Sequence, residues 1–207
     1  MPRMTGVPAR QAGPLMRLGY FFARRQLVRL TGREPERILE AMEITAHAPE
    51  VLRAHGSLEQ ATAKMHRVDK RVKWLAEAKA ATLVHCEFCI DIGSQILRRG
   101  GVSDEELLAL PNYRTSGLFS DVEKLAMDYA VGMSRTPAEV SDELFAELRR
   151  HFDDAQLVEL THQIALGNLR GRFNVGLGIG AAGFSEGMVC ALPEPVPQAA
   201  AENTATT

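Results

Sequence analysis

Three candidate helix starts in the second half of the chain constrain its fold more than any other feature. At each start a Ser or Thr is followed three positions later by Glu: Ser103 and Glu106, Ser120 and Glu123, Thr136 and Glu139. This spacing is that of the reciprocal capping box, in which each side chain binds a backbone N–H of the first helical turn. Apolar residues recur at helical spacing after these positions, and strand-like alternation is essentially absent. We therefore predict an all-α fold.

Further helices are expected in the first half of the chain. Their predicted ranges are 15–31, 34–46, 48–64, 69–84 and 87–99. With 207 residues and 45% hydrophobic content, the chain has enough apolar material for one core. We predict a single helical domain over residues 1–192. Residues 193–207 are rich in Ala, Pro and Thr, and this composition predicts a disordered tail.

The segment at residues 178–183 matches the GxGxxG spacing of dinucleotide-binding turns. That motif acts only after a strand, where it opens a helix within a βαβ unit. An all-helical chain offers no such unit, so we predict no nucleotide cofactor. Instead we expect residues 176–183 to form a helix whose small residues let another helix approach closely.

Charge and cysteine content favour some partners and compartments over others. A net charge of −2 gives no concentrated basic face, so nucleic acid is not an expected partner. Three cysteines do not suit a disulfide-stapled secreted scaffold and fit a reducing compartment, with cytoplasm as the default. Residues 1–33 carry seven arginines and no acidic residue, which could indicate a membrane-surface or targeting helix. Their apolar runs are too short for a signal peptide or a membrane span, so we expect a helix docked on its own fold or on a neighbouring subunit, and no membrane partner.

Cys86 and Cys89 stand three residues apart, where a helix is expected to begin. Two such thiols can form a disulfide and can share one lowered thiol pKa. Zinc would need four ligands, but the sequence has no second Cys-x-x-Cys, Cys190 stands alone, and the six histidines show no paired spacing. The leading interpretation is a redox-active dithiol without metal. A metal site and an inert buried pair are the alternatives.

The segments around the cysteines form a recognisable pattern, at residues 76–80, 85–93 and 101–106. Together they resemble the carboxymuconolactone decarboxylase / alkylhydroperoxidase D family. The likeness covers about residues 70–110 and continues more weakly at 170–174. The resemblance implies an antiparallel helical domain in which the Cys-x-x-Cys opens a helix. It also implies a homo-oligomer, commonly a trimer or hexamer, with the site near subunit contacts.

The peroxidase branch of that family carries a glutamate twelve residues before the first cysteine and a histidine four residues after the second. These groups relay protons, and this chain has Trp74 and Gly93 in their places. Glu77 lies on nearly the same helix face as Trp74 and could substitute. The alternative is a surface glutamate paired with Lys73 or Arg71. We expect Gly93 to leave room for a substrate or another helix.

The resemblance and the paired cysteines together predict a thiol-dependent oxidoreductase, either a peroxidase or a disulfide reductase. Its substrate would be a peroxide or a disulfide, its electron donor a thiol of unknown identity, and it would need no cofactor. We expect Cys86 to be the more exposed, exchanging thiol and Cys89 its disulfide partner, although peroxide reduction could reverse this order. Glu77 is the candidate proton acceptor, and His85 could lower the thiol pKa when protonated. The alternatives are a non-redox enzyme of the decarboxylase type and an interaction protein whose dithiol senses oxidation.

Overall fold

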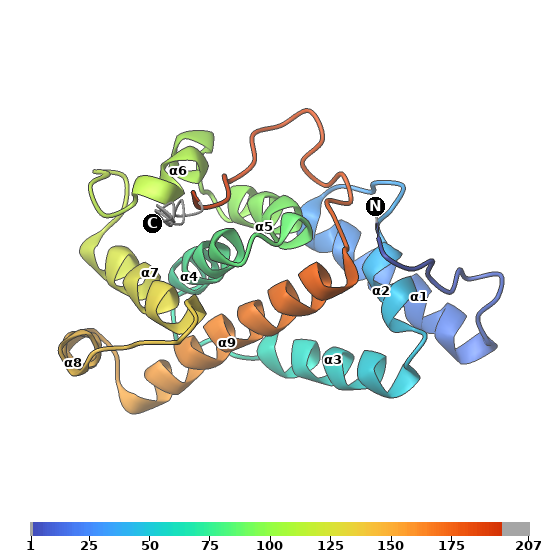
Figure 1. Ribbon diagram of the computed structural model, residues 1–207, viewed down its shortest axis with the longest axis horizontal. Helices are drawn as coiled ribbons and strands as arrows, with labels where there is room; N and C mark the ends of the chain where they lie inside the picture. The colour runs from blue at the N-terminus through green and yellow to red at the C-terminus, as the bar shows by residue number, and fades with distance from the viewer. Residues whose placement is uncertain (1, 196–207) are drawn as a thin grey trace, which may run out of the picture.

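The computed structural model describes residues 2–195, and every regular element within that range is a helix (Figure 1). In chain order the elements are α1 (Pro14–Thr31), α2 (Glu40–Thr45), α3 (Pro49–Thr62), α4 (Lys70–Leu83), α5 (Glu87–Arg99), α6 (Asp104–Ala109), the short 3-10 helix η1 (Leu110–Asn112), α7 (Asp121–Ser134), α8 (Asp142–His151) and α9 (Asp154–Leu177). The all-α prediction is confirmed. Within the described range, no helix combines the length and the apolar character needed to cross a membrane. The predicted tail from residue 196 onward lies outside the described residues.

Helix α4 is the centre of the fold, and α5, α7 and α9 pack around it (Figure 1). Leu75 faces one core cluster, which includes residues of α5, α6 and α7. Ala76 and Ala80 face a second cluster, formed with α7, α8 and α9. Because α4 has neighbours on several sides, even Lys73 is buried, and its ammonium group forms an ion pair with Glu159 of α9.

Two of the three predicted capping boxes are present, those that begin α6 at Ser103 and α7 at Ser120. The prediction at Thr136 is wrong, because α8 begins six residues later, after Ser141. The Thr136 hydroxyl instead accepts a hydrogen bond from Arg172, and the Glu139 N–H donates to the Gly132 carbonyl oxygen. A β-carbon at Gly132 would collide with the Glu139 carbonyl oxygen, so the chain here folds back tightly over α7.

Two predicted helices differ from those observed. In the range 34–46 only α2 is helical, because the preceding residues form turns that place Ile38 in a small cluster with Phe184. The helix expected at 176–183 is also wrong, since α9 ends at Leu177. Gly178 has a φ of +67°, the left-handed conformation that commonly follows a helix C-terminus. The glycine-rich segment is therefore a helix stop followed by irregular chain.

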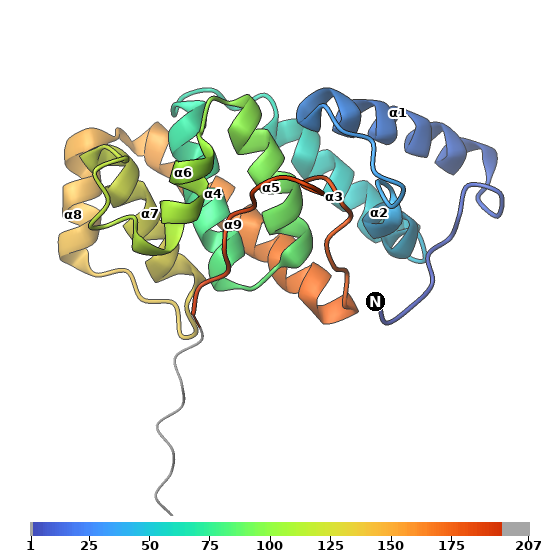
Figure 2. The same cartoon turned by 90° about the horizontal axis from the view of Figure 1, so that it is seen from above.

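Residues 179–195, here called the C-terminal strap, run along α5 back toward α4 (Figure 2). Its first attachment is the Asp91 carboxylate, which accepts four backbone N–H groups from residues 182–185. Farther along, the Ala191 N–H donates to the Ser94 hydroxyl at 3.0 Å. At its end, the Glu194 N–H donates to the Thr82 carbonyl oxygen at 3.1 Å. The ordered contacts thus continue past residue 192, and the strap forms one wall beside the helix that carries the cysteines.

Candidate functional site

Cys86 and Cys89 lie at the N-terminus of α5 and form a disulfide, with their Cα atoms 5.2 Å apart. Cys86 is the N-cap residue, and its Sγ accepts a hydrogen bond from the Cys89 N–H at 3.1 Å. The sulfur therefore takes the place that a Ser or Asp side chain fills at most helix starts. First-turn N–H groups and the helix dipole favour negative charge at this position, so a reduced Cys86 would be stabilised as a thiolate.

Helix α9 closes the site from the other side. A β-carbon at Gly171 would collide with the Val84 side chain and lie 3.6 Å from the Cys86 Cβ, so the glycine permits the close approach of α9. One turn farther on, the Asn174 amide nitrogen lies 3.7 Å from the Cys86 Sγ and 3.6 Å from the Cys89 Sγ. Asn174 is 7% exposed, which makes its amide a buried donor directed at both sulfurs. Sequence reasoning missed this residue; its only signal was the weak family likeness at 170–174.

The two cysteines differ in exposure, in the opposite sense to the sequence-based prediction. Cys86 is fully buried at 0% exposure, whereas Cys89 is partly exposed. The expectation that Cys86 is the more exposed thiol is wrong, because the close contact of α9 covers it. An external reactant therefore reaches Cys89 more readily than Cys86.

Glu77 is held in a network with α9 and α3 and not by its own helix. Its carboxylate accepts hydrogen bonds from Gln163 and from Arg170, and Arg170 also forms a two-point pair with Glu59 at 2.6 Å. Burial disfavours the charged guanidinium, but the two carboxylates outweigh it and raise the pKa of Arg170. No hydrogen bond joins Glu77 to either sulfur among the described residues.

The alternative partners considered for Glu77 are engaged elsewhere. Lys73 pairs with Glu159, and Arg71 pairs with two other carboxylates, those of Glu106 and Glu123. The alternative of a surface pair of Glu77 with Lys73 or Arg71 is therefore wrong. Glu77 keeps a fixed orientation through Arg170 and Gln163, two turns of α4 before the turn that leads to Cys86.

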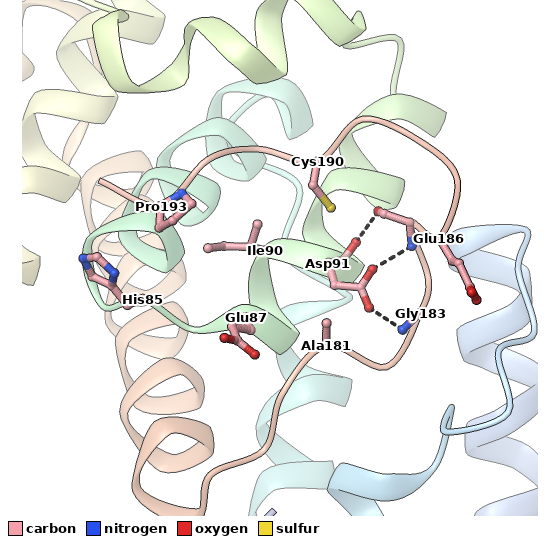
Figure 3. A pocket seen from close by; sticks show the side chains of 10 residues that line it. His85, Glu87, Ile90, Asp91, Ala181, Gly183, Glu186, Cys190 and Pro193 are labelled. Carbon is pink, nitrogen blue, oxygen red and sulfur yellow. Dashed lines mark hydrogen bonds between the residues drawn. The ribbon is translucent and has the colours of Figure 1, made fainter. Parts of the chain in front are cut away.

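His85 precedes the disulfide in a left-handed conformation, with a φ of +54°. Non-glycine residues adopt this conformation uncommonly, and it turns the chain sharply from α4 into α5. The imidazole is exposed and lines a cavity of about 510 Å³ between α5 and the C-terminal strap. Figure 3 shows His85 and Glu87 beside this cavity, with Cys190 and Pro193 contributed by the strap.

Asp91 also lines this cavity, but its carboxylate oxygens are occupied by the backbone of the strap (Figure 3). It serves as an anchor and not as a free acid or base near the thiols. Cys190 carries a free thiol at intermediate exposure. Within residues 2–195, no group of three or more His, Cys, Asp or Glu side chains is arranged to hold a metal ion.

The two positions that depart from the peroxidase pattern have different surroundings. The Trp74 ring packs against Gly100 at the end of α5, where a β-carbon would collide with it. A β-carbon at Gly93 would meet no atom within 4 Å. No helix of the described chain therefore occupies the space beside Gly93, and α5 could accept a larger side chain there. That this space admits a substrate stays a prediction.

Comparisons with known proteins agree with this fold. Residues 49–131 match the family model of the carboxymuconolactone decarboxylase family. The uncharacterized protein YnjA of Escherichia coli (strain K12) is 44% identical over 132 residues, covering 63% of this chain and 69% of YnjA. The solved structure of the debrominase Bmp8 has a TM-score of 0.72 at 20% identity, covering 84% of this chain and 91% of Bmp8. A peroxidase-related protein from Ralstonia eutropha JMP134, with an alkylhydroperoxidase AhpD core, has a TM-score of 0.68 at 18% identity, covering 87% and 92% of the two chains.

Proposed function

This chain belongs to the carboxymuconolactone decarboxylase family, and from its paired cysteines we propose that it is a thiol-dependent oxidoreductase. Cys86 and Cys89 would cycle between a dithiol and a disulfide while reducing a peroxide or a disulfide substrate. The observation that carries the proposal is the pair itself: two sulfurs joined at a helix N-terminus, with a backbone N–H and the Asn174 amide directed at them.

With a hydroperoxide as substrate, the reaction needs two nucleophilic steps. The Cys89 thiolate attacks the terminal peroxide oxygen, the O–O bond breaks, and the alkoxide leaves and takes up a proton to form an alcohol. The Cys86 thiolate then attacks the sulfur of the Cys89 sulfenic acid, and hydroxide leaves as water. The net change is one hydroperoxide and two thiols converted to one alcohol, one water and one disulfide.

A dithiol donor would restore the reduced protein by thiol–disulfide exchange. Its thiolate attacks the accessible Cys89 sulfur, and Cys86 leaves as the thiolate. The Cys89 N–H and the Asn174 amide favour that departure, because both donate to the sulfur on which negative charge develops. The donor's second thiol then displaces Cys89 and carries away the oxidising equivalents as its own disulfide.

Proton transfer in this scheme does not need Glu77 in contact with a sulfur. Glu77 is tied to Arg170 and Gln163, so we propose that it positions α9, and with it the Asn174 amide, relative to α4. The exposed His85 is the candidate that exchanges protons with solvent next to the disulfide. Both assignments replace the direct relay expected from the family pattern.

The test is steady-state consumption of hydrogen peroxide and of an alkyl hydroperoxide, with lipoyl, thioredoxin-type and low-molecular-weight thiol donors. We expect Cys89→Ser to abolish turnover. Cys86→Ser should still react once with peroxide and leave a sulfenic acid on Cys89 that dimedone traps. Cys190→Ser is the matched control and should turn over like the unaltered protein.

The same assay separates the rival functions. Turnover of a lactone acid that survives replacement of both cysteines would favour a non-redox enzyme of the decarboxylase type. A disulfide that forms once with every oxidant, without multiple turnover with any donor, would favour a redox-sensing interaction protein. Either result would contradict the proposal.

A further inference from the structure

Lys79 is a buried cation that the dithiol chemistry does not use. It lies on α4, is 2% exposed, and is among the largest fully buried side chains of the described residues. Its ammonium group donates to the Leu110 carbonyl oxygen at 3.1 Å and lies 4.5 Å from the centre of the Tyr113 ring. A charged ammonium in such a place needs an anion, because burial without a counter-charge strongly disfavours the charged form.

The anion comes from the end of the C-terminal strap. The Glu194 carboxylate forms an ion pair with Lys79 and is 19% exposed. Burial lowers the pKa of Lys79, and the Glu194 carboxylate opposes that shift. The only other hydrogen bond described for Glu194 is its backbone N–H to Thr82 at 3.1 Å, so the carboxylate is supplied by an irregular segment and not by a helix of the core.

A hollow of about 200 Å³ is lined in part by this ion pair. Its wall contains two further cationic side chains, Arg114 and Arg135, and polar groups at Asn112 and Thr115. Arg114 is shared with Asp128 at 2.6 Å, whereas Arg135 is exposed at the rim. One core carboxylate lies near this wall, that of Asp128, which pairs with Arg114, accepts from the Tyr113 hydroxyl and also favours the charged form of Lys79. Among the residues that line the hollow, however, the carboxylate is that of Glu194, from the strap.

We propose that the hollow around Lys79 is a binding site for a small organic carboxylate, and that Glu194 occupies it as an exchangeable internal ligand. The bound carboxylate would take the place of the Glu194 side chain on the Lys79 ammonium and reach toward Arg135. Its arrival would release the end of the strap, which also borders the cavity that contains His85 and Cys190.

The internal ligand should weaken the apparent affinity for an added carboxylate by competition. A group tethered by a short flexible segment acts at an effective concentration in the millimolar range. Removing the Glu194 carboxylate should therefore tighten the apparent Kd for a free carboxylate by about tenfold or more. Glu194→Gln keeps the size of the side chain and removes only its charge.

The experiment measures binding of acetate and succinate by the thermal shift of the oxidised full-length protein, with potassium chloride at matched ionic strength as the reference. Glu194→Gln should show carboxylate-dependent stabilisation at concentrations about tenfold lower than the unaltered protein. Lys79→Met in the Glu194→Gln background should remove it, and this variant should fold because an apolar replacement of a buried ion pair is commonly tolerated. Stabilisation no greater than that from chloride in Glu194→Gln would overturn the proposal.

A second readout follows release of the strap. With the Cys86–Cys89 disulfide intact, Cys190 is the one free thiol of the protein. Its reaction with a chromogenic disulfide reagent should accelerate when succinate is added to the unaltered protein, and should already be fast in Glu194→Gln. An unchanged rate in both would contradict the exchange of Glu194 for the ligand.

Discussion

Replacing Asn174 by Leu tests how the protein stabilises its thiolates. The substitution keeps the branched shape of the side chain and removes the amide that lies 3.7 Å from the Cys86 Sγ and 3.6 Å from the Cys89 Sγ. In the disulfide these contacts join neutral groups and are weak. In the reduced protein they become hydrogen bonds to a charged sulfur, which are stronger. The substitution should therefore destabilise the reduced thiolate form more than the disulfide form.

The magnitude follows from the geometry. A hydrogen bond to a charged group contributes about 1.5–3 kcal/mol, and the long N–S distances place this one at the lower end. A loss of about 1.5 kcal/mol corresponds to a rise of about one unit in the pKa of the reacting thiol. For a two-electron couple the same loss lowers the reduction potential by about 30 mV, because the reduced form is the one that loses stability.

The reduction potential is measured by equilibration with reduced and oxidised glutathione, followed by alkylation of the free thiols. The thiol pKa is measured from the pH dependence of the alkylation rate. The matched control is Asn168→Leu on the same helix, since the Asn168 amide donates to Ser134 at 2.9 Å and has no contact with sulfur. The control should leave both the potential and the thiol pKa unchanged. A shift of equal size in both variants, or no shift in Asn174→Leu, would refute the reasoning.

Three further predictions concern the rest of the molecule. Gly93→His should fold, because a β-carbon there meets no atom within 4 Å. It should raise the rate of single-turnover oxidation of Cys89 by peroxide up to about 10²-fold, and the rate should show a new ionisation near pH 6.5. An unchanged rate would show that a base at this position does not help. Lys73→Met should lower the free energy of unfolding by about 3–5 kcal/mol, because it leaves the buried carboxylate of Glu159 unpaired. Burial opposes the charged form of Glu159, but Lys73 and two backbone N–H groups outweigh it and hold the pKa of Glu159 below the ordinary value of 4.5. The stability from this pair is therefore present above pH 4.5 and is lost as the pH falls through the lower, folded-state pKa. Chemical denaturation between pH 3 and 7 should show that loss in the unaltered protein and a flatter dependence of stability on pH in the variant. Light scattering at low micromolar concentration should give a multiple of 22.7 kDa, because α1 exposes several leucine and phenylalanine side chains that a second copy could cover; a monomer at that concentration would contradict the proposed homo-oligomer.

Local signals in the sequence were sufficient for most of the helices. Ser103 and Ser120 identified the starts of α6 and α7 because a capping box is made within four residues. The same pattern failed at Thr136, where a hydrogen bond from Arg172 of α9 replaced the local one. Likewise, the pattern of small residues predicts a helix through Gly178, whereas the left-handed conformation of Gly178 ends α9. Each failure came from a contact or a conformation that the local pattern does not specify.

At the candidate site, too, local features follow from the sequence and contacts with distant segments do not. The pairing of Cys86 with Cys89 follows from their spacing, because residues three apart at a helix start are close in space. Their relative exposure does not follow from the spacing, since Cys86 is covered by a part of α9 that lies more than eighty residues farther along the chain. For the same reason the sequence offers only Lys73 and Arg71, on the same helix, as alternative partners of Glu77, whereas Arg170 and Gln163 of α9 take that role. Sequence reasoning recovered the reactive groups but not the groups that position them.

The measurement that tests the central claim most directly is a redox titration of the full-length protein with glutathione buffers, with peptide mapping of the alkylated and disulfide-linked cysteines. We expect one reversible two-electron transition in which Cys86 and Cys89 are lost together to alkylation. Cys190 should remain alkylated at every potential. A transition that joins Cys190 to either of the other cysteines, or a Cys86–Cys89 pair that does not interconvert reversibly, would contradict the proposed dithiol chemistry.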